Sequence, residues 1–432
     1  MVELTEYEKD LLNGIYGADK QKAMELIVEY AIALGAKKLV EVHSVTGGLG
    51  ASKDIMADLK SNDYDMEKIY CEYKLNSSEK VSVNKVCVPT TTLINLLDFD
   101  KIDELEISED IVKYCKIADN FSKKIGMQNL YTCAPYLSGF IPMYGEHLAW
   151  MESSAVIMAN SVFGARTNTE SLESTGAASI VGRIPYWGLH IKENRYADYH
   201  IKVEVDIDSE FEYGLLGYYI GETVQEKIPV ITGITKRPTL EKLKHFGAAL
   251  AASGGVELYH IVGVTPEANT FEEAVGTKKN QKTIVITKKE LLETYKKINM
   301  HQNKSKIDFV IFGCPHASLE QIKEIVELIE NKKINKNVKM WILTPYSVKS
   351  LCDRQGYTKI IEDFGALLLS DICPAIAGLV PKNTKNIVTN SIKQAHYISN
   401  LLKCNCYYSS LEKCISAAIT GEWNGDLNDI EI

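Results

Sequence analysis

The sequence predicts an α/β protein with several domains and mainly parallel sheets. In its second half, short apolar runs alternate with amphipathic segments of helical length. Strands separated by helices form parallel layers that right-handed crossovers connect. The 432 residues also exceed what one hydrophobic core usually serves, so two or three domains are expected. A composition of 45% hydrophobic and 24% charged residues is that of an ordinary soluble protein.

The first elements combine a helix, a strand and a glycine-rich loop. A helical pattern covers 7–35, a strand is expected at 38–42, and glycines at 47–50 open a loop. This order is typical of mononucleotide sites, but the spacing of the known glycine motifs is missing. A structural or substrate-contacting loop is therefore favoured. Residues 81–88 indicate a strand, and Thr90–Thr92 are expected to cap a following helix.

The middle of the chain is rich in small and polar residues. Gly, Ser, Asn and Ala dominate 139–195, where a long helix is expected from Glu146 to about Val162. A strand is expected at 203–207. This composition is that of a binding pocket that would receive a small substrate.

The second half alternates regularly between the two kinds of element. Helices are expected at 242–252, 318–329, 347–354, 391–402 and 410–420, and strands at 256–262, 284–286, 309–312, 339–343, 366–369, 387–388 and 406–408. Ligands of such sheets gather at the carboxyl ends of the strands. Cys314 and Cys373 fall at that position.

Composition and motifs exclude several classes of function. A net charge of −9 argues against a nucleic-acid partner, because there is no excess of Lys and Arg to neutralise phosphates. The acidic N-terminus lacks the apolar region of a signal peptide. The sequence contains no run of about 18 apolar residues, so no membrane helix is expected. A cytoplasmic protein with its ten cysteines mostly reduced is expected, and the lack of a CxxC pair excludes zinc ribbons.

Three cysteines stand out because each lies in a short loop-like segment with a nearby proline. They are Cys133 in YTCAP, Cys314 in GCPH and Cys373 in DICP. Three thiolates can hold an iron–sulfur cluster and leave one iron open to substrate. The alternative is that these cysteines are small buried hydrophobes, and spacing alone leaves both possibilities open. That alternative is favoured for the other seven, which are Cys71, Cys87, Cys115, Cys352, Cys404, Cys406 and Cys414.

Acidic and imidazole side chains flank the start of the expected helix at Glu146. Glu146, His147 and Glu152 could donate or accept protons at an active centre. The acids could equally complement the positive end of a helix, and their positions alone do not decide.

Two segments combine arginine with small polar side chains, which suits the capture of a carboxylate or phosphate. They contribute Arg166, Thr167, Asn168, Arg183 and His190. A basic residue at a helix end is the alternative for Arg166. Ser391 and Lys393 open another helix, and helix N-termini commonly receive anions.

Taken together, these segments resemble the large subunit, or catalytic domain, of the aconitase X family. The matching blocks span roughly 127–420, and residues 1–126 match less distinctively. The blocks are YTCAPYLSGFIPMYGEHLAWMESSAVIMANSVFGARTN, GRIPYWGLHIKENR, LKHFGAALAASGGVELYHIVGVTPEA, GCPHASLEQ, SDICP and TNSIKQAHY.

The resemblance implies an aconitase-like, multi-domain arrangement of α/β layers that lacks the family's small swivelling domain. The expected parts are an N-terminal α/β region (1–126), a cluster and substrate region (127–270), a polar insertion or linker (271–308), and a C-terminal α/β region (309–432). It also implies an iron–sulfur hydro-lyase with Cys133, Cys314 and Cys373 as ligands. Three cysteines fit a 4Fe-4S cluster with one open iron, or a 2Fe-2S cluster with one other ligand.

The resemblance also implies roles for polar residues of the matching blocks. The iron takes the departing hydroxyl, a base removes a proton, and arginines hold the acid group. The expected catalytic residues are Glu146, His147, Glu152 and Lys393. The expected substrate-binding residues are Ser44, Thr46, Ser153, Ser154, Arg166, Thr167, Asn168, Arg183, His190 and Ser391.

A partner and a substrate class follow from the same resemblance. In this family a small swivelling domain, fused or separate, supplies a catalytic serine, so a small partner subunit is expected. The Lys-, Asn- and Ile-rich composition, common in low-GC bacteria, favours cis-3-hydroxy-L-proline as substrate. 5-Phosphomevalonate is the alternative and would demand a more basic pocket. A non-catalytic iron–sulfur or RNA-binding role is the alternative of a different class, and the acidic net charge opposes RNA.

Overall fold

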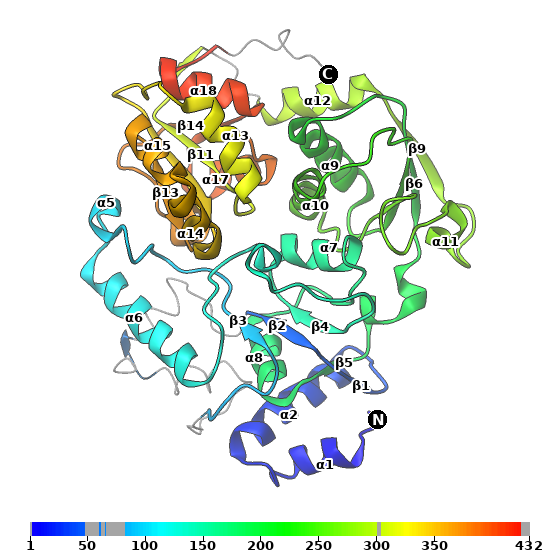
Figure 1. Ribbon diagram of the computed structural model, residues 1–432. Helices are drawn as coiled ribbons and strands as arrows, with labels where there is room; N and C mark the ends of the chain where they lie inside the picture. The colour runs from blue at the N-terminus through cyan, green and yellow to red at the C-terminus, as the bar shows by residue number, and fades with distance from the viewer. Residues whose placement is uncertain (1, 48–59, 62–64, 66–82, 300–303, 425–432) are drawn as a thin grey trace. The chain divides into compact units, whose positions relative to one another are not determined.

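The computed structural model describes residues 2–47, 60–61, 65, 83–299 and 304–424 (Figure 1). The chain divides into two compact units. The first comprises residues 1–136 and 140–195, and the second comprises residues 137–139 and 196–432. Both are α/β units with mainly parallel sheets, which confirms the predicted fold class. Within the described part of the chain, no helix combines the length and the apolar character needed to cross a bilayer.

The first unit is built on a small parallel sheet with the strand order β3-β2-β4, beside an antiparallel pair of β1 and β5. Helix α8 is buried along most of its length and packs against α2. The elements are α1 (Glu6–Leu12), α2 (Ala18–Ala33), β1 (Leu39–Glu41), β2 (Ser44–Thr46), β3 (Thr90–Thr91), α5 (Ile102–Leu105), α6 (Glu109–Lys124), β4 (Leu148–Trp150), α7 (Ser153–Ser161), α8 (Leu172–Val181) and β5 (Arg183–Pro185), with short 3-10 turns at Gly188–His190 and Lys192–Arg195.

The second unit contains two parallel sheets, with the strand orders β8-β7-β6-β9 and β13-β12-β11-β14-β15. Elements of the first sheet and its helices are β6 (Tyr199–Val203), α9 (Glu210–Val224), β7 (Pro229–Thr232), α10 (Leu240–Gly254), β8 (His260–Ile261), α11 (Phe271–Val275), β9 (Lys282–Ile286) and α12 (Lys288–Ile298). The remaining elements are β10 (Ser305–Lys306), β11 (Phe309–Phe312), α13 (Leu319–Ile329), β12 (Lys339–Thr344), α14 (Tyr346–Gln355), α15 (Tyr357–Phe364), β13 (Leu367–Ser370), α16 (Pro374–Ala377), β14 (Asn386–Thr389), α17 (Ile392–Leu402), β15 (Asn405–Tyr408), α18 (Leu411–Thr420) and β16 (Glu422–Trp423).

The five-stranded sheet follows directly from the sequence pattern. All four residues of β11 are buried, as expected for a central strand covered on both faces. Helix α13 begins at Ser318, which forms a capping box with Gln321. Its apolar face, with Ile322, Ile325 and Ile329, enters the core of this sheet. The expected helices and strands of the second half are therefore present, and apart from the strand expected at 256–262 their ends shift only slightly.

Helices α9 and α10 lie side by side (Figure 1) and pack closely because glycines occupy their contact face. A Cβ added at Gly217 would lie 2.5 Å from the carbonyl oxygen of Phe246, and one at Gly221 would lie 2.7 Å from that of Leu250. Both oxygens are backbone atoms, so neither can rotate away. Only glycine permits this approach of the two helices.

Replacing Gly217 by valine is therefore expected to destabilise the second unit by about 1–3 kcal/mol, because the added methyl groups overpack the helix contact. Chemical denaturation followed by circular dichroism measures the effect. Valine at Ala252, a partly exposed position of α10, is the matched control and should change little. If both variants unfolded at the same denaturant concentration as the parent, the contact would not need glycine.

The expected helix from Glu146 is wrong over its first seven residues. Leu148–Trp150 form strand β4, which pairs with Ser44–Thr46, and the helix begins only at Ser153. All three β4 side chains are buried, and strand pairing at a buried site outweighs the helical pattern. Glu146 and His147 therefore precede a strand and do not begin a helix.

Other differences concern short strands. Thr90–Thr91 form strand β3 instead of capping a helix. The strand expected at 203–207 ends at Val203, and the one expected at 256–262 is confined to 260–261. Residues 83–88 form no strand, while 81–82 and the glycines at 48–50 lie outside the described residues.

Candidate functional site

The second unit brings two of the three selected cysteines to one edge of its five-stranded sheet. Cys314 follows β11 and Cys373 follows β13, and both strands run parallel to β12 between them. The prediction that these cysteines follow the carboxyl ends of parallel strands is confirmed. Both residues are partly exposed.

The loops that carry these cysteines are held by specific contacts. The hydroxyl of Ser391 donates to the carbonyl oxygen of Cys314 and accepts from the amide of Gln394 at 3.1 Å, so it also caps α17. Asp371 has a left-handed backbone (φ 70°), and its carboxylate accepts from the amide of Tyr346 at 3.2 Å. The Cys314 loop is thus held by a side chain from outside it, and the Cys373 loop is held by its own Asp371, which bonds the backbone at the start of α14.

Cys133 belongs to the first unit and is also partly exposed. Its loop follows Tyr131, which has a left-handed backbone (φ 44°), and the hydroxyl of Thr132 accepts from the amide of Ala134 at 3.0 Å. The loop character predicted for this cysteine is therefore confirmed.

The other cysteines behave differently. Cys115, Cys352, Cys404, Cys406 and Cys414 are buried, as predicted. Burial raises the pKa of the Cys115 and Cys352 thiols to about 12, which suppresses thiolate chemistry. Cys87 is exposed, so the prediction of a buried residue is wrong there, and Cys71 lies outside the described residues.

Partly exposed thiols in anchored loops fit an iron–sulfur group, because the ligands of such clusters are thiolates. Within the described residues, no group of three or more His, Cys, Asp or Glu side chains is arranged to hold a metal ion. The second unit contributes two candidate ligands and the first unit one. The fit therefore rests on the chemistry and exposure of the three thiols.

A cavity of about 460 Å³ lies in the second unit beside Cys314. Gly313, Pro315 and Asn390 line it, and so do the first residues of α9, α10, α13 and α18. Its acidic side chains outnumber its basic ones. The acids are Asp208, Glu210, Glu241, Glu320, Glu324 and Glu412, and the basic residues are Lys242 and His245.

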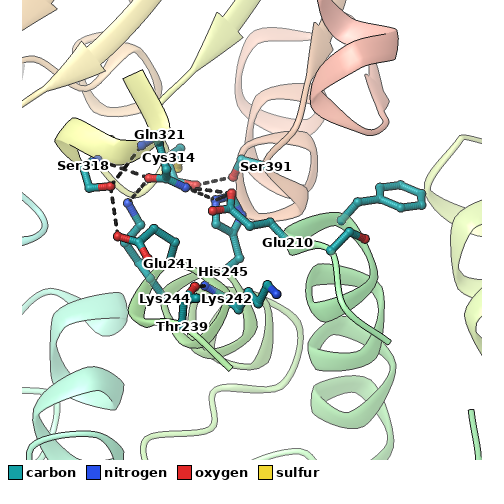
Figure 2. A network of polar contacts seen from close by, with 12 residues as sticks. Glu210, Thr239, Glu241, Lys242, Lys244, His245, Cys314, Ser318, Gln321 and Ser391 are labelled. Carbon is teal, nitrogen blue, oxygen red and sulfur yellow. Dashed lines mark hydrogen bonds and ion pairs between the residues drawn. The ribbon is translucent and has the colours of Figure 1, made fainter. Parts of the chain in front are cut away.

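Ion pairing and burial act in opposite directions on two acids of this cavity, of which Figure 2 shows Glu210 beside His245. Burial alone would raise the pKa of Glu210, but the His245 ring, 3.1 Å away, outweighs it, and the pKa is lowered to about 2. Gln321 adds a hydrogen bond to the same carboxylate at 2.8 Å. Burial and the neighbouring carboxylates of Glu210 and Glu241 raise the pKa of Glu324. The charge of Glu210 is thus balanced by His245, and carboxylate side chains still outnumber basic ones around the cavity.

In the first unit, His147 and His190 form a pair whose Nδ1 atoms lie 3.0 Å apart. His190 is fully buried, and Arg166 donates to its carbonyl oxygen at 3.2 Å. Burial, with a smaller contribution from His147, lowers the pKa of His190 to about 3. Burial and Arg166 lower the pKa of His147 to about 4. Both rings are neutral at pH 7, so one Nδ1 donates and the other accepts.

Acid is therefore expected to destabilise this unit. The folded state keeps His190 neutral, whereas the unfolded chain protonates it below its ordinary pKa of 6.5. The contribution of His190 to the free energy of unfolding is complete above pH 6.5. It is lost as the pH falls toward about 3, by about 1.4 kcal/mol per pH unit. His190→Gln should flatten the dependence of the unfolding free energy on pH in this window, measured by denaturation. An unchanged slope would show that another group is responsible.

Several predicted substrate residues of the first unit lie close together along β2, β4 and the start of α7. Ser44 accepts from the indole of Trp150 at 3.1 Å, and Thr46 accepts from the amide of Met151 at 3.3 Å. Glu152 caps α7 and accepts from the hydroxyl of Ser154 at 3.0 Å. Ser153 is the first residue of that helix.

The remaining predicted residues have partners within the chain. Thr167 and Asn168 are buried and bond the backbone around Trp150 and Leu189. Glu146 accepts from the amide of Met143 at 2.8 Å.

Basic residues complete the set of predicted positions. Arg183 pairs with Glu8 at 3.0 Å and covers the ring of Tyr7. Lys393 is 8% exposed in the first turn of α17, which Ser391 caps in the second unit. The roles predicted for all these residues stay predictions.

Sequence reasoning missed the polar residues that surround the Cys314 loop. These are Glu210, Lys244, His245, His316 and Gln321. Lys244 and His245 lie inside an ordinary helical pattern, where a buried lysine cannot be distinguished from an exposed one. His316 was the one available signal, because it follows Cys314 and Pro315 directly.

Comparison with known proteins agrees with this fold. Three family models match the chain: the aconitase X first domain over residues 1–193, the second domain over 197–296 and the third domain over 307–420. The chain belongs to the aconitase X family.

Curated relatives and a solved structure support the assignment. The chain is 36% identical to the phosphomevalonate dehydratase large subunit of Methanocaldococcus jannaschii, over 95% of this chain and 99% of that protein. It is 31% identical to cis-3-hydroxy-L-proline dehydratase of Hypocrea jecorina, over 97% of this chain and 69% of that protein. A crystal structure of Thermococcus kodakaraensis aconitase X in its holo-form superposes with a TM-score of 0.80 and 31% identity, over 96% of this chain and all of that one.

These relatives confirm the predicted enzyme class. They are named dehydratases, which are lyases, and this chain is a lyase of the same family. The name "large subunit" of several relatives implies that those proteins work with a smaller partner.

Proposed function

We propose that this chain is the large subunit of an iron–sulfur-dependent hydro-lyase that removes water from a small hydroxy acid in the cytoplasm. The observation that carries the proposal is the position of Cys314 and Cys373, partly exposed at the carboxyl ends of β11 and β13 in an aconitase X chain. Cys133 would be the third ligand. The cluster, either 4Fe-4S or 2Fe-2S, would supply a Lewis acid for the departing hydroxyl group.

The chain's own residues would bind the substrate and move its proton. His147 is neutral at pH 7 because its pKa is about 4, so its ring can accept a proton. Glu146, Glu152 and Lys393 are the other proposed acid–base groups. Arg166 would hold the acid group of the substrate, together with the other binding residues predicted above. Those residues are Ser44, Thr46, Ser153, Ser154, Thr167, Asn168, Arg183, His190 and Ser391.

We favour cis-3-hydroxy-L-proline as the substrate. The cavity beside Cys314 has six carboxylate side chains and two basic ones. The secondary amine of this substrate is a cation at neutral pH, whereas a phosphate would be repelled by such a lining. A relative from Pseudomonas aeruginosa, 29% identical to this chain, is named cis-3-hydroxy-L-proline dehydratase.

5-Phosphomevalonate is the second candidate, favoured by a different observation. The relatives named for it match at 36% and 34% identity and are covered over 99% and 94% of their length. The name "large subunit" that they carry also supports a separate small partner, which would supply a catalytic serine.

An oxygen-free assay of the reconstituted chain tests these proposals. The chain, loaded with iron and sulfide, would be mixed with its small partner and given each substrate separately. We expect dehydration of cis-3-hydroxy-L-proline by the pair and none by the chain alone. If only 5-phosphomevalonate were dehydrated, it would be the substrate in place of cis-3-hydroxy-L-proline. Full activity of the isolated chain would refute the need for a small partner.

A further inference from the structure

We propose that His316 and Lys244 are positioning residues that hold the Cys314 and Cys373 loops in a fixed relative position for metal binding. The inference rests on the proposed function, in which these two cysteines are metal ligands. Neither residue contacts the substrate in this account. They act through the backbone of the loops that carry the thiols.

His316 connects the two loops directly. Its ring is 1% exposed, and its Nε2 atom lies 3.0 Å from the carbonyl oxygen of Ile372, the residue before Cys373. A carbonyl oxygen can only accept, so Nε2 carries the hydrogen and donates it. Because His316 lies two residues after Cys314, this bond joins the loop after β11 to the loop after β13, across the intervening strand β12.

Lys244 fixes the backbone carbonyl group of the same residue. Its ammonium group, on helix α10, donates to the carbonyl oxygen of His316 at 2.7 Å, and the side chain is 1% exposed. A buried cation is stable only when its hydrogen bonds are satisfied. The His316 carbonyl is therefore held at a definite place by a charged donor with little freedom.

The lysine is itself held by neighbouring side chains (Figure 2). Its ammonium group also donates to the amide oxygen of Gln321, which accepts from the backbone of Ser318 at 3.2 Å. The amide nitrogen of Gln321 donates to Glu210 at 2.8 Å, and the hydroxyl of Ser318 donates to Glu241 at 3.2 Å. Charges from α9 and α10 thus converge on the start of α13, next to the Cys314 loop.

Three contacts therefore hold the loops that carry Cys314 and Cys373. Ser391 of the α17 cap holds the carbonyl of Cys314, Lys244 holds that of His316, and His316 holds that of Ile372. Partners of this kind orient metal ligands before the metal arrives, and their loss typically weakens metal affinity by about 10–100-fold. Without them, the two loops could move independently.

Cobalt titration of the full chain tests this role without any measurement of activity. The chain is stripped of iron under oxygen-free conditions and titrated with Co²⁺, and the thiolate-to-cobalt charge-transfer band is recorded. We expect His316→Ala to weaken cobalt affinity by about 10–100-fold and to reduce the band. His316→Gln, whose amide can still donate from the Nε2 position, should stay near the parent. The matched control is His396→Ala, because His396 bonds the Tyr218 hydroxyl and that bond involves neither cysteine loop.

The outcomes separate the two proposals. If the parent chain gives no thiolate-to-cobalt band, the proposed metal site fails. If the parent gives the band and His316→Ala matches it in affinity and intensity, the positioning role fails. Thermal unfolding of each variant is recorded in parallel. If His316→Ala does not fold, it is replaced by His316→Asn, whose amide reaches only the Nδ1 position. Equal cobalt affinity of the Asn and Gln variants would then overturn the inference.

Discussion

Cys314→Ser is expected to abolish cluster binding and dehydration together. Serine is a much weaker ligand for iron than a thiolate, and Cys314 is one of only two partly exposed cysteines among the described residues of the second unit. Iron and sulfide content after oxygen-free reconstitution, the visible absorbance and the dehydration rate measure the effect. We expect all three to fall to background.

Cys87→Ser is the matched control for this variant. Cys87 is exposed, lies in the first unit and has no assigned role, so its loss should leave iron content and rate unchanged. If Cys314→Ser kept the iron content and the dehydration rate of the parent, Cys314 would not be a ligand.

Arg195→Met is expected to destabilise the first unit by about 2–6 kcal/mol. The Arg195 side chain is 2% exposed and donates to two backbone carbonyls, that of Asn160 at 3.0 Å and that of Leu189 at 3.1 Å. Each buried acceptor left without its donor costs about 1–3 kcal/mol. Denaturation followed by tryptophan fluorescence measures the loss.

The control for this prediction is Arg354→Met, at an exposed position of α14, which should change the unfolding free energy by less than about 0.5 kcal/mol. A midpoint of Arg195→Met within the range of this control would mean that Asn160 and Leu189 find other donors.

The second half of the fold could be predicted from the sequence because local and tertiary preferences agree there. The buried run Phe309–Phe312 and the capping box at Ser318 each specify one kind of element. For the same reason, the pattern of apolar residues suffices to predict that Cys314 and Cys373 follow the ends of strands.

The region around Glu146 could not be predicted in the same way. The spacing of apolar residues over 146–162 fits a helix, and only pairing with Ser44–Thr46, about a hundred residues earlier, makes Leu148–Trp150 a strand. Likewise, a helical pattern cannot reveal that Lys244 is buried, because its partners His316 and Gln321 lie more than seventy residues away. Contacts between residues so far apart in the chain cannot be recognised from the local sequence pattern.

Dependence of the dehydration rate on iron tests the central claim most directly. The chain and the proposed small partner would be assayed without oxygen before iron removal, after removal by a chelator, and after iron and sulfide are restored. The rate is expected to be lost with the iron and to return with it. A rate that is unchanged after the iron has been removed would contradict it.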